Sequence, residues 1–184
     1  MATTRNNFIL QGLHGLLGRQ LVLRRDKIGR TIVCARPSFD PHHEFTALQK
    51  AHHRAFREAA RYALSAKDEP VYVRKATGTS SNPYNIAIAD WFHPPHILDI
   101  DLGSWTGQPG QVICIKASDD VLVKEVTVSI TDTYGALLEH GCAVQAGDLN
   151  WLYTTTTTAS GPLKLLAAAQ DLPGHVTQLT RLFP

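Results

Sequence analysis

The chain has 184 residues, of which 43% are hydrophobic and 18% are charged, and its formal net charge is +2. This composition is typical of a folded chain with one good core or two small ones, and it excludes a disordered or collagen-like protein. Residues 1–75 carry 14 Lys and Arg against 6 Asp and Glu, whereas residues 76–184 carry 4 against 10. A basic first part and an acidic second part favour head-to-tail contact between copies, with nucleic-acid contact by the first part as the alternative.

The first twenty residues contain an early Arg but no continuous apolar segment and no cleavage site, so no secretion signal is predicted. No run of about 18 apolar residues occurs, and no membrane span is predicted. We therefore expect synthesis in the cytoplasm, for a protein that stays there or joins a released or phage-like particle. The three cysteines, at 34, 114 and 142, form no zinc-binding pattern. Buried free thiols are favoured over a Cys114–Cys142 disulfide, and no cofactor is expected.

Residues 8–23 form an apolar segment with glycines at 12, 15 and 18. No Gly-Lys-Ser/Thr sequence follows, so these glycines do not indicate a phosphate loop; they indicate close backbone approach or bends in an extended arm. Such an arm can add strands to the sheet of a neighbouring copy. The predicted assembly interface combines the arm with the basic hairpin that follows, and comprises Phe8, Leu10, Leu13, Leu16, Leu17, Arg24, Arg25 and Arg30.

Residues 20–37 predict a β-hairpin, because two short aliphatic runs flank a turn that ends at Gly29. Pro37 ends the second strand. Basic residues gather in this hairpin without the interleaved exposed aromatic side chains of a nucleic-acid surface. The hairpin therefore favours an acidic protein surface, here another copy or another assembly protein, over nucleic acid as the partner.

Residues 46–66 predict one long helix with a stripe of alanines, and Thr46 and Gln49 fit a capping box at its start. Residues 70–92 are ambiguous, although Asn82-Pro83 signals the start of a helix. Two histidine pairs, His42-His43 and His52-His53, flank the start of the long helix. Neighbours on a helix point about 100° apart, so solvated surface or a subunit contact is favoured over a metal site.

From residue 96 onward seven strand-like runs are separated by turn signals, which predicts an immunoglobulin-like or fibronectin-like antiparallel sandwich. Val126, Val128 and Ile130 alternate with polar residues, and Trp151 and Tyr153 share one face of a strand as candidate core aromatics. The run Thr154 to Thr158 predicts an edge strand, or a strand offered to another subunit.

The predicted fold class is therefore mainly β with one long helix (α+β). Residues 1–92 form an assembly segment of arm, hairpin and helix, and residues 93–184 form the sandwich. The segments AAAQDLPGH and VTVSITDTYGALLEHGCAV resemble the last turns and strands of bacterial immunoglobulin-like domains.

The first half of the chain resembles the N-terminal part of uncharacterised bacterial proteins. In those proteins, a similar N-terminal part precedes an immunoglobulin-like second half. The resemblance rests on Gly12, Gly15 and Gly18, then Arg24, Gly29, Thr31, Val33 and Pro37, then Thr46, Gln49 and residues 56–59. It implies a fold but no catalytic residues. Similar short proteins look like structural parts of phage-like or other bacterial assemblies.

The segment DWFHPPHILDID, residues 90–101, is the best candidate for a metal site, because His93, His96, Asp99 and Asp101 could serve a metal-dependent hydrolase. The two prolines between the histidines impose an extended geometry, which excludes a helical H-x-x-H site. A rigid interdomain joint, with no metal and no catalytic residue, is therefore favoured. The predicted joint residues are Trp91, Phe92, Pro94 and Pro95.

No G-x-S-x-G or H-E-x-x-H motif is present. The sequence therefore favours a non-enzymatic structural subunit that self-associates through its N-terminal arm into a homopolymer, with an open polymer preferred to a ring. Two alternatives stay open: the metal-dependent hydrolase, and a carbohydrate-binding module that uses Trp91, Trp105 and Trp151.

Overall fold

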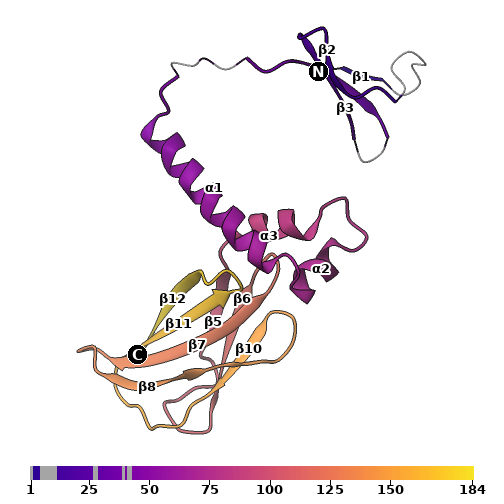
Figure 1. Cartoon of the computed structure of the whole chain (residues 1–184). Coiled ribbons are helices and arrows are strands. Elements are labelled where there is room, and N and C mark those ends of the chain that lie inside the picture. Colours follow the sequence, from indigo (N-terminus) through magenta and orange to yellow (C-terminus); the bar gives the residue numbers. More distant parts are fainter. Residues whose placement is uncertain (1, 5–11, 27–28, 39, 41–42) are drawn as a thin grey trace. The chain divides into compact units, whose positions relative to one another are not determined.

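The chain divides into two compact units, Met1–His52 and His53–Pro184 (Figure 1). The computed structural model describes residues 2–4, 12–26, 29–38, 40 and 43–184. The division falls within the long helix, and the boundary expected between residues 92 and 93 lies inside the second unit. It lies there because helical residues and sandwich turns share one cluster of packed side chains, described below.

The first unit contains a small antiparallel sheet with the strand order β1-β4-β3-β2. The strands are β1 (Ala2–Thr4), β2 (Gly15–Leu17), β3 (Leu21–Arg25) and β4 (Thr31–Ala35). The predicted hairpin is confirmed as β3 and β4. Asp26 holds its turn, since its Oδ1 accepts from the Arg30 backbone N–H at 2.8 Å and its Oδ2 pairs with Arg30 Nε at 2.5 Å.

The expected extended arm is wrong for residues 15–23, because Gly15–Leu17 is itself a strand that pairs with β3. The chain reverses between the two strands at Gly18 and Arg19, which have φ angles of 57° and 61°. Such positive φ angles are costly for a residue with a side chain, so Arg19 gave no turn signal in the sequence. Phe8 and Leu10 of the predicted arm lie outside the described residues.

Three helices follow: α1 (Ala47–Ala66), α2 (Pro70–Ala76) and α3 (Pro83–Phe92). The helix expected at residues 46–66 corresponds to α1, but the expectation of a single helix is wrong, because α2 and α3 follow it. The capping box at the start of α1 is present, because the Thr46 N–H donates to Gln49 Oε1 at 2.9 Å and the Gln49 N–H donates to Thr46 Oγ1 at 3.3 Å. Asn82 caps α3 by accepting from the Asn85 N–H at 2.8 Å.

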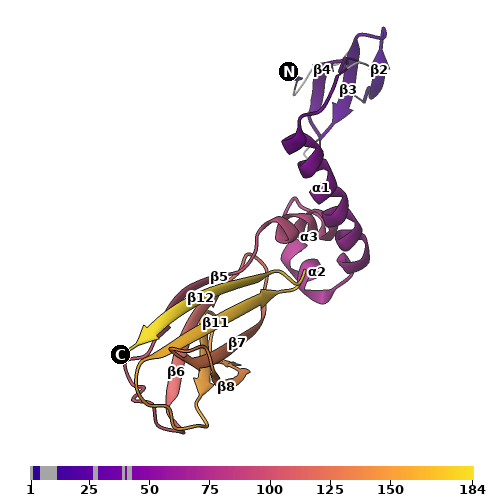
Figure 2. The ribbon, with the colours of Figure 1, turned by 90° about the vertical axis from the view of Figure 1, so that its left-hand side faces the viewer.

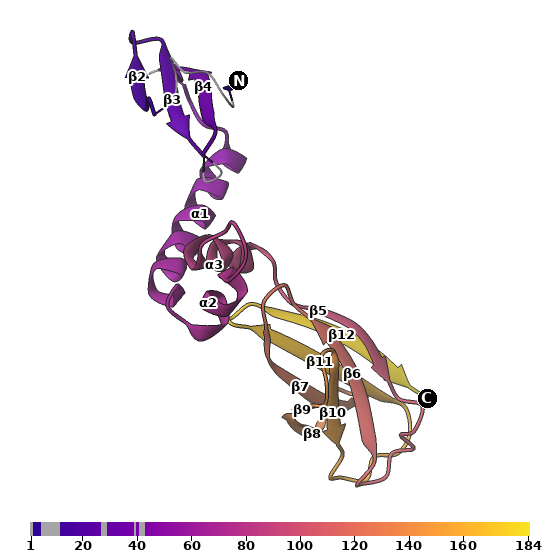
Figure 3. The same ribbon diagram turned by 90° about the vertical axis from the view of Figure 1, so that its right-hand side faces the viewer.

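The rest of the second unit is a pair of four-stranded antiparallel sheets, with the orders β5-β6-β10-β9 and β12-β11-β7-β8 (Figures 2 and 3). Each of the seven predicted runs contains a strand, and the run at residues 136–144 divides into two. The strands are β5 (His96–Asp101), β6 (Val112–Ser118), β7 (Val123–Asp132), β8 (Leu137–Cys142), β9 (Val144–Gln145), β10 (Asn150–Thr154), β11 (Leu163–Asp171) and β12 (Val176–Phe183).

The core of the sandwich lies between these sheets. Val126, Val128 and Ile130 of β7 are at most 1% exposed, which confirms the predicted alternation. Trp151 and Tyr153 of β10 are also buried, as predicted from their shared face. Each fully buried aliphatic side chain contributes about 1.5–3 kcal/mol of transfer free energy, so this core is the main source of stability in the second unit.

The threonine run does not continue as an edge strand, because β10 ends at Thr154. The buried carboxylate of Glu139 on β8 accepts from the backbone N–H and hydroxyl of Thr156 at 2.7 and 2.9 Å, and from those of Thr157 at 3.2 and 2.8 Å. Tyr153 adds a fifth bond at 2.7 Å. Since β8 and β10 belong to different sheets, this carboxylate ties the two sheets together.

The three cysteines are free, and Cys142 is exposed while Cys34 and Cys114 are partly buried. The expectation of buried thiols is therefore wrong for Cys142, which lies on the edge strand β8.

The helices pack against one end of the sandwich. A second cluster of buried side chains, from Ala63, Ala66, Tyr72 and Ala87, includes Val121 and Leu172 as partly buried neighbours. Val121 belongs to the β6–β7 loop and Leu172 to the β11–β12 turn. This cluster joins the helical layer, residues 53–92, to the two sheets.

Candidate functional site

The sheet of the first unit carries apolar residues on both of its faces. Residues directly opposite each other in an antiparallel pair share a face. Leu16 is opposite Val22, and Val22 is opposite Cys34; Leu17 is opposite Leu21. Alternation along the strands adds Ile32 to the first of these faces, and Leu23 and Val33 to the second.

Little of this apolar surface is buried by the unit's own residues. Among its described residues only Leu23 and Thr31 are buried. The exposed leucines are Leu13 at 46%, Leu16 at 54%, Leu17 at 51% and Leu21 at 40%. Strands that are apolar on both faces are typical of a sheet covered on both sides. The sheet of the first unit is therefore the strongest candidate for an interaction surface.

Leu16 and Leu17 of the predicted interface belong to β2, Arg24 and Arg25 to β3, and Arg30 to the hairpin turn, while Leu13 precedes β2. Leu13, Arg24 and Arg25 are exposed. Arg30 is partly buried and is held by Asp26. The structure thus places Leu16, Leu17, Arg24 and Arg25 on one sheet instead of on an arm and a separate hairpin.

The predicted metal ligands are not brought together. His93 Nδ1 lies 2.8 Å from Asp120 Oδ2, while Asp99 pairs with Arg181 at 3.2 Å. Asp101 Oδ1 accepts from the Gly103 N–H at 2.9 Å. In the part of the chain that the structure describes, no group of three or more His, Cys, Asp or Glu residues could hold a metal ion.

A cavity of about 660 Å³ borders His93 and His96. Pro94 also lines it, and Pro95 is buried. Because α3 ends at Phe92, the two prolines continue the chain outside the helix, as predicted. Ser118, Asp119 and Asp120 complete the lining of the cavity.

Trp91 and Phe92 end α3 beside the β11–β12 turn. The Trp91 ring lies 5.0 Å from the Phe92 ring and 5.2 Å from the His175 ring, both edge to face. Aromatic pairs in this geometry contribute about 0.5–1.5 kcal/mol beyond their burial. The contact between Trp91 and His175 joins the end of α3 to the sandwich.

Asp171 shapes that turn. It is fully buried, and its Oδ1 accepts from the N–H groups of Gly174 at 2.7 Å and His175 at 2.6 Å. Its Oδ2 lies 2.9 Å from His175 Nδ1. Asp171, Gly174 and His175 are residues of the segment that resembles bacterial immunoglobulin-like domains, and here they organise the turn between β11 and β12.

A buried polar chain, which the sequence did not reveal, lies inside the helical layer. Tyr72 OH donates to Asp90 Oδ2 and lies 2.6 Å from Tyr62 OH. Asp90 is 1% exposed. Burial and, to a lesser extent, the charges of Asp119 and Asp171 raise its pKa, the Tyr72 hydrogen bond lowers it, and the net pKa is about 6. The one available signal was a lone Asp inside the apolar run IAIADWF.

Two of the three tryptophans proposed for carbohydrate binding are buried, since Trp105 is 2% and Trp151 6% exposed, whereas Trp91 is partly exposed. Sugar-binding rings must lie on the surface, and these two rings are part of the sandwich core.

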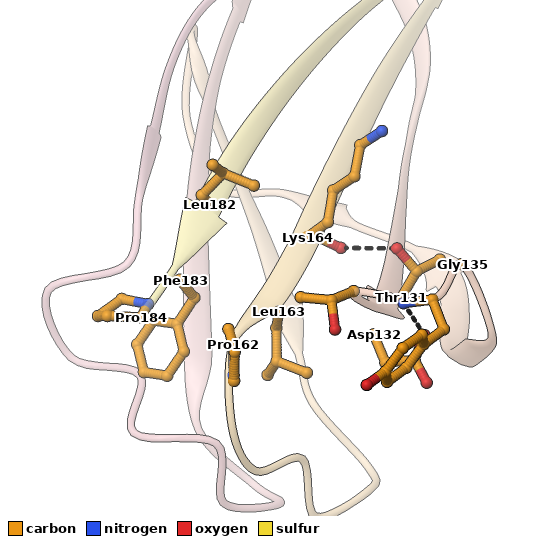
Figure 4. Close-up of a pocket in the computed structure, with 11 residues that line it drawn as sticks. Thr131, Asp132, Gly135, Pro162, Leu163, Lys164, Leu182, Phe183 and Pro184 are labelled. Atoms are coloured by element: carbon orange, nitrogen blue, oxygen red, sulfur yellow. Dashed lines mark hydrogen bonds between the residues drawn. The ribbon is translucent and has the colours of Figure 1, made fainter.

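A cavity of about 850 Å³ lies beside the β7–β8 turn and the end of β12 (Figure 4). Its walls include Pro162, Leu163, Leu182 and Phe183. Asp132 also lines it, but Asp132 Oδ1 accepts from two backbone N–H groups of the β7–β8 turn at 2.8 Å. The cavity is therefore lined mostly by apolar side chains. The Asp132 carboxylate already accepts hydrogen bonds from the β7–β8 turn.

Among the described residues, no helix is long and apolar enough to cross a membrane.

Comparison with protein-family models gave no match. No curated protein matches the sequence either. Among solved structures, CopC from Methylosinus trichosporium OB3b matches with a TM-score of 0.39 and 16% identity, over 48% of this chain and 90% of CopC. An engineered protein matches with a TM-score of 0.35 and 16% identity, over 54% of this chain and 26% of its own. Similarities of this size transfer no function to the chain.

Proposed function

We propose that the protein is a non-enzymatic structural subunit that self-associates through its first unit into a homopolymer, such as a filament or a phage-like assembly. The observation that carries this proposal is the sheet of β2, β3 and β4, which is apolar on both faces and exposes leucines on each of them. A surface of this kind needs a partner to cover it.

The distribution of charge favours a second copy as that partner. The first 75 residues are strongly basic and the remaining residues are acidic. Arg24 and Arg25 lie on the apolar sheet itself, one on each face by alternation. A basic unit that meets the acidic part of another copy makes a heterologous contact, which repeats as a filament unless it closes into a ring.

Burial of the exposed leucines of the first unit would contribute substantially to the free energy of association. Full burial of a leucine yields about 1.5–3 kcal/mol, so covering four half-exposed leucines yields roughly 3–6 kcal/mol per copy. Association itself costs about 4–15 kcal/mol, so charged and backbone contacts at the same interface must add to the leucines.

The proposal includes an immunoglobulin-like sandwich in the manner of the uncharacterised bacterial proteins that the chain resembles. The orders β5-β6-β10-β9 and β12-β11-β7-β8 correspond to immunoglobulin strands A-B-E-D and G-F-C-C′. Sandwiches of this type serve in many surface and assembly proteins, so the fold supports a structural role without specifying it.

Light scattering after size exclusion, together with negative-stain microscopy, tests the proposal. Wild-type protein is expected to form large species whose size grows with concentration. A double variant, Leu16→Asp with Leu17→Asp, places a charge on each face and is expected to be monomeric. Leu137→Asp is the matched control, because Leu137 is 61% exposed and lies in the second unit.

A wild-type protein that stays monomeric and dispersed at tens of micromolar would contradict the proposal. Assembly of the double variant as readily as the wild type would move the interface away from this sheet.

A further inference from the structure

Two carboxyl groups meet at the contact between the helical layer and the sandwich. Asp90 belongs to α3, and Asp119 belongs to the β6–β7 loop. The Oδ1 atom of each is buried without a hydrogen-bond donor from the described residues. Asp90 lines one cavity with Asp120 and Val121, the residues that follow Asp119, and a side-chain hydrogen bond between Asp90 and Asp119 is one of the causes that raise the pKa of Asp90. Two ionised carboxylates cannot bond to each other, so one proton held between them would satisfy both atoms.

The remaining oxygens show which carboxyl keeps the proton. Asp119 Oδ2 accepts from the N–H groups of Val121 at 2.9 Å and Leu122 at 2.8 Å, so this oxygen serves as an acceptor. Asp90 has only the hydroxyl of Tyr72 on its Oδ2 and is more deeply buried. The protonated group is therefore Asp90, which donates to Asp119.

We propose that Asp90 and Asp119 form a proton-dependent latch that holds α2 and α3 against the end of the sandwich. With the proton present, a hydrogen bond joins α3 to the β6–β7 loop. Without it, two negative charges face each other in a buried site, which is costly at low dielectric. Loss of the proton therefore loosens the contact between the helical layer and the sheets.

The surrounding charged groups reinforce this behaviour. Asp171, buried at the end of β11, adds a negative charge that acts on Asp90, although His175 partly balances it. Lys75 of α2 and Asp120 line a cavity of about 370 Å³ together with Asp90. Tyr62 and Tyr72 stay neutral, since burial raises the pKa of both. The acidic groups outnumber Lys75, so Asp90 holds its proton above its ordinary range.

The direction of the pH dependence follows from the raised pKa of Asp90. The pKa moves from 3.8 in the open chain to about 6 in the closed structure. The closed form therefore binds the proton more tightly, and its stability falls as the pH rises from about 4 to about 6. These two pKa values predict that the equilibrium constant for detachment of the helical layer from the sheets rises about tenfold between pH 5 and pH 7.5.

Hydrogen exchange measured by mass spectrometry on the full-length protein tests the latch. After correction for intrinsic rates, amides of residues 70–92 are expected to exchange about tenfold faster at pH 7.5 than at pH 5, while core amides of β7 and β11 change little. Asp90→Asn mimics the protonated group, since its amide donates to Asp119 and its carbonyl accepts from Tyr72. This variant is expected to exchange slowly at both pH values.

Asp119→Asn supplies a second test, because its amide donates to an ionised Asp90 and its carbonyl still accepts from the loop. The pH dependence is expected to weaken in this variant, because the charge of Asp119 is gone while the burial of Asp90 remains. Asp120→Asn is the control and should keep it, because Asp120 is 65% exposed and pairs with His93. Equal pH dependence in the wild type and both latch variants would overturn the proposal, as would wild-type exchange that does not change with pH.

Discussion

Glu139 shows how a single buried carboxylate fixes a segment that sequence patterns alone describe poorly. Threonines favour strands, and a run of them predicts another strand. Here two of them instead surround the Glu139 side chain with backbone and hydroxyl donors. The hydroxyl of Thr155 donates away from Glu139, to the carbonyl of Gln108 at 2.8 Å. The run therefore acts as a set of hydrogen-bond donors between the sheets.

Glu139→Gln is expected to destabilise the second unit by roughly 2–3 kcal/mol, because the amide turns one acceptor into a donor among five donors. Thermal or urea unfolding measures this change. Glu125→Gln is the control on the neighbouring strand β7 and should cost far less, since Glu125 is only partly buried. Equal losses in the two variants would contradict the assignment of Glu139 as the tie between the sheets.

The stabilisation by the Glu139 carboxylate depends on pH in a direction that follows from its pKa shift. Burial raises the pKa of Glu139, but hydrogen bonds from Tyr153, Thr157 and Thr156 together lower it more, and the net shift is downward from 4.5. The stabilisation is therefore present above pH 4.5 and is lost as the pH falls through the lower pKa of the folded state. The Asp90 latch responds in the opposite direction and over a higher range of pH.

Among the elements, those with strong local signals were predictable. The sandwich strands follow from alternation and turn residues, and α1 follows from its alanine stripe and capping box. The short helix α2 was not predictable, because Pro-Val-Tyr-Val fits a strand as well as a helical turn. Its conformation depends on Tyr72, which is fully buried and bonds to Asp90 on another helix. Tertiary contact overrides local propensity there.

The candidate sites also depend on tertiary contacts that local sequence patterns do not indicate. The exposed leucines of the first unit were recognisable as an apolar run, but their placement on two faces depends on the reversal at Gly18 and Arg19. The pairing of Asp90 with Asp119 joins residues from a helix and a loop of the sandwich. No pattern within either segment indicates the other.

The contribution of the α3 N-cap to stability can be tested by substitution. Asn82→Ala removes the acceptor of the Asn85 N–H and is expected to destabilise the unit by about 1 kcal/mol. Asn85→Ala is the control; its backbone N–H still donates to Asn82, and alanine favours the helix. Circular dichroism during thermal unfolding compares the two, and a larger loss in the control would contradict the capping role.

For the whole molecule, the uneven charge predicts how assembly responds to salt. Attraction between basic and acidic parts is screened as ionic strength rises, whereas apolar contact is not weakened by salt. The assembled fraction is therefore expected to fall between about 0.05 M and about 0.5 M sodium chloride. Light scattering at fixed protein concentration measures it. An assembled fraction that rises with salt would mean that apolar contact alone drives association.

Leu16 and Leu17 are neighbours in the chain but point to opposite faces of the sheet. If each face of the sheet packs against the opposite face of another copy's sheet, these apolar contacts give every subunit a valence of two. A subunit altered on one face only would then still add to a growing end and would stop growth there. The two-sided sheet thus makes polymer length depend on the supply of intact subunits as well as on their affinity.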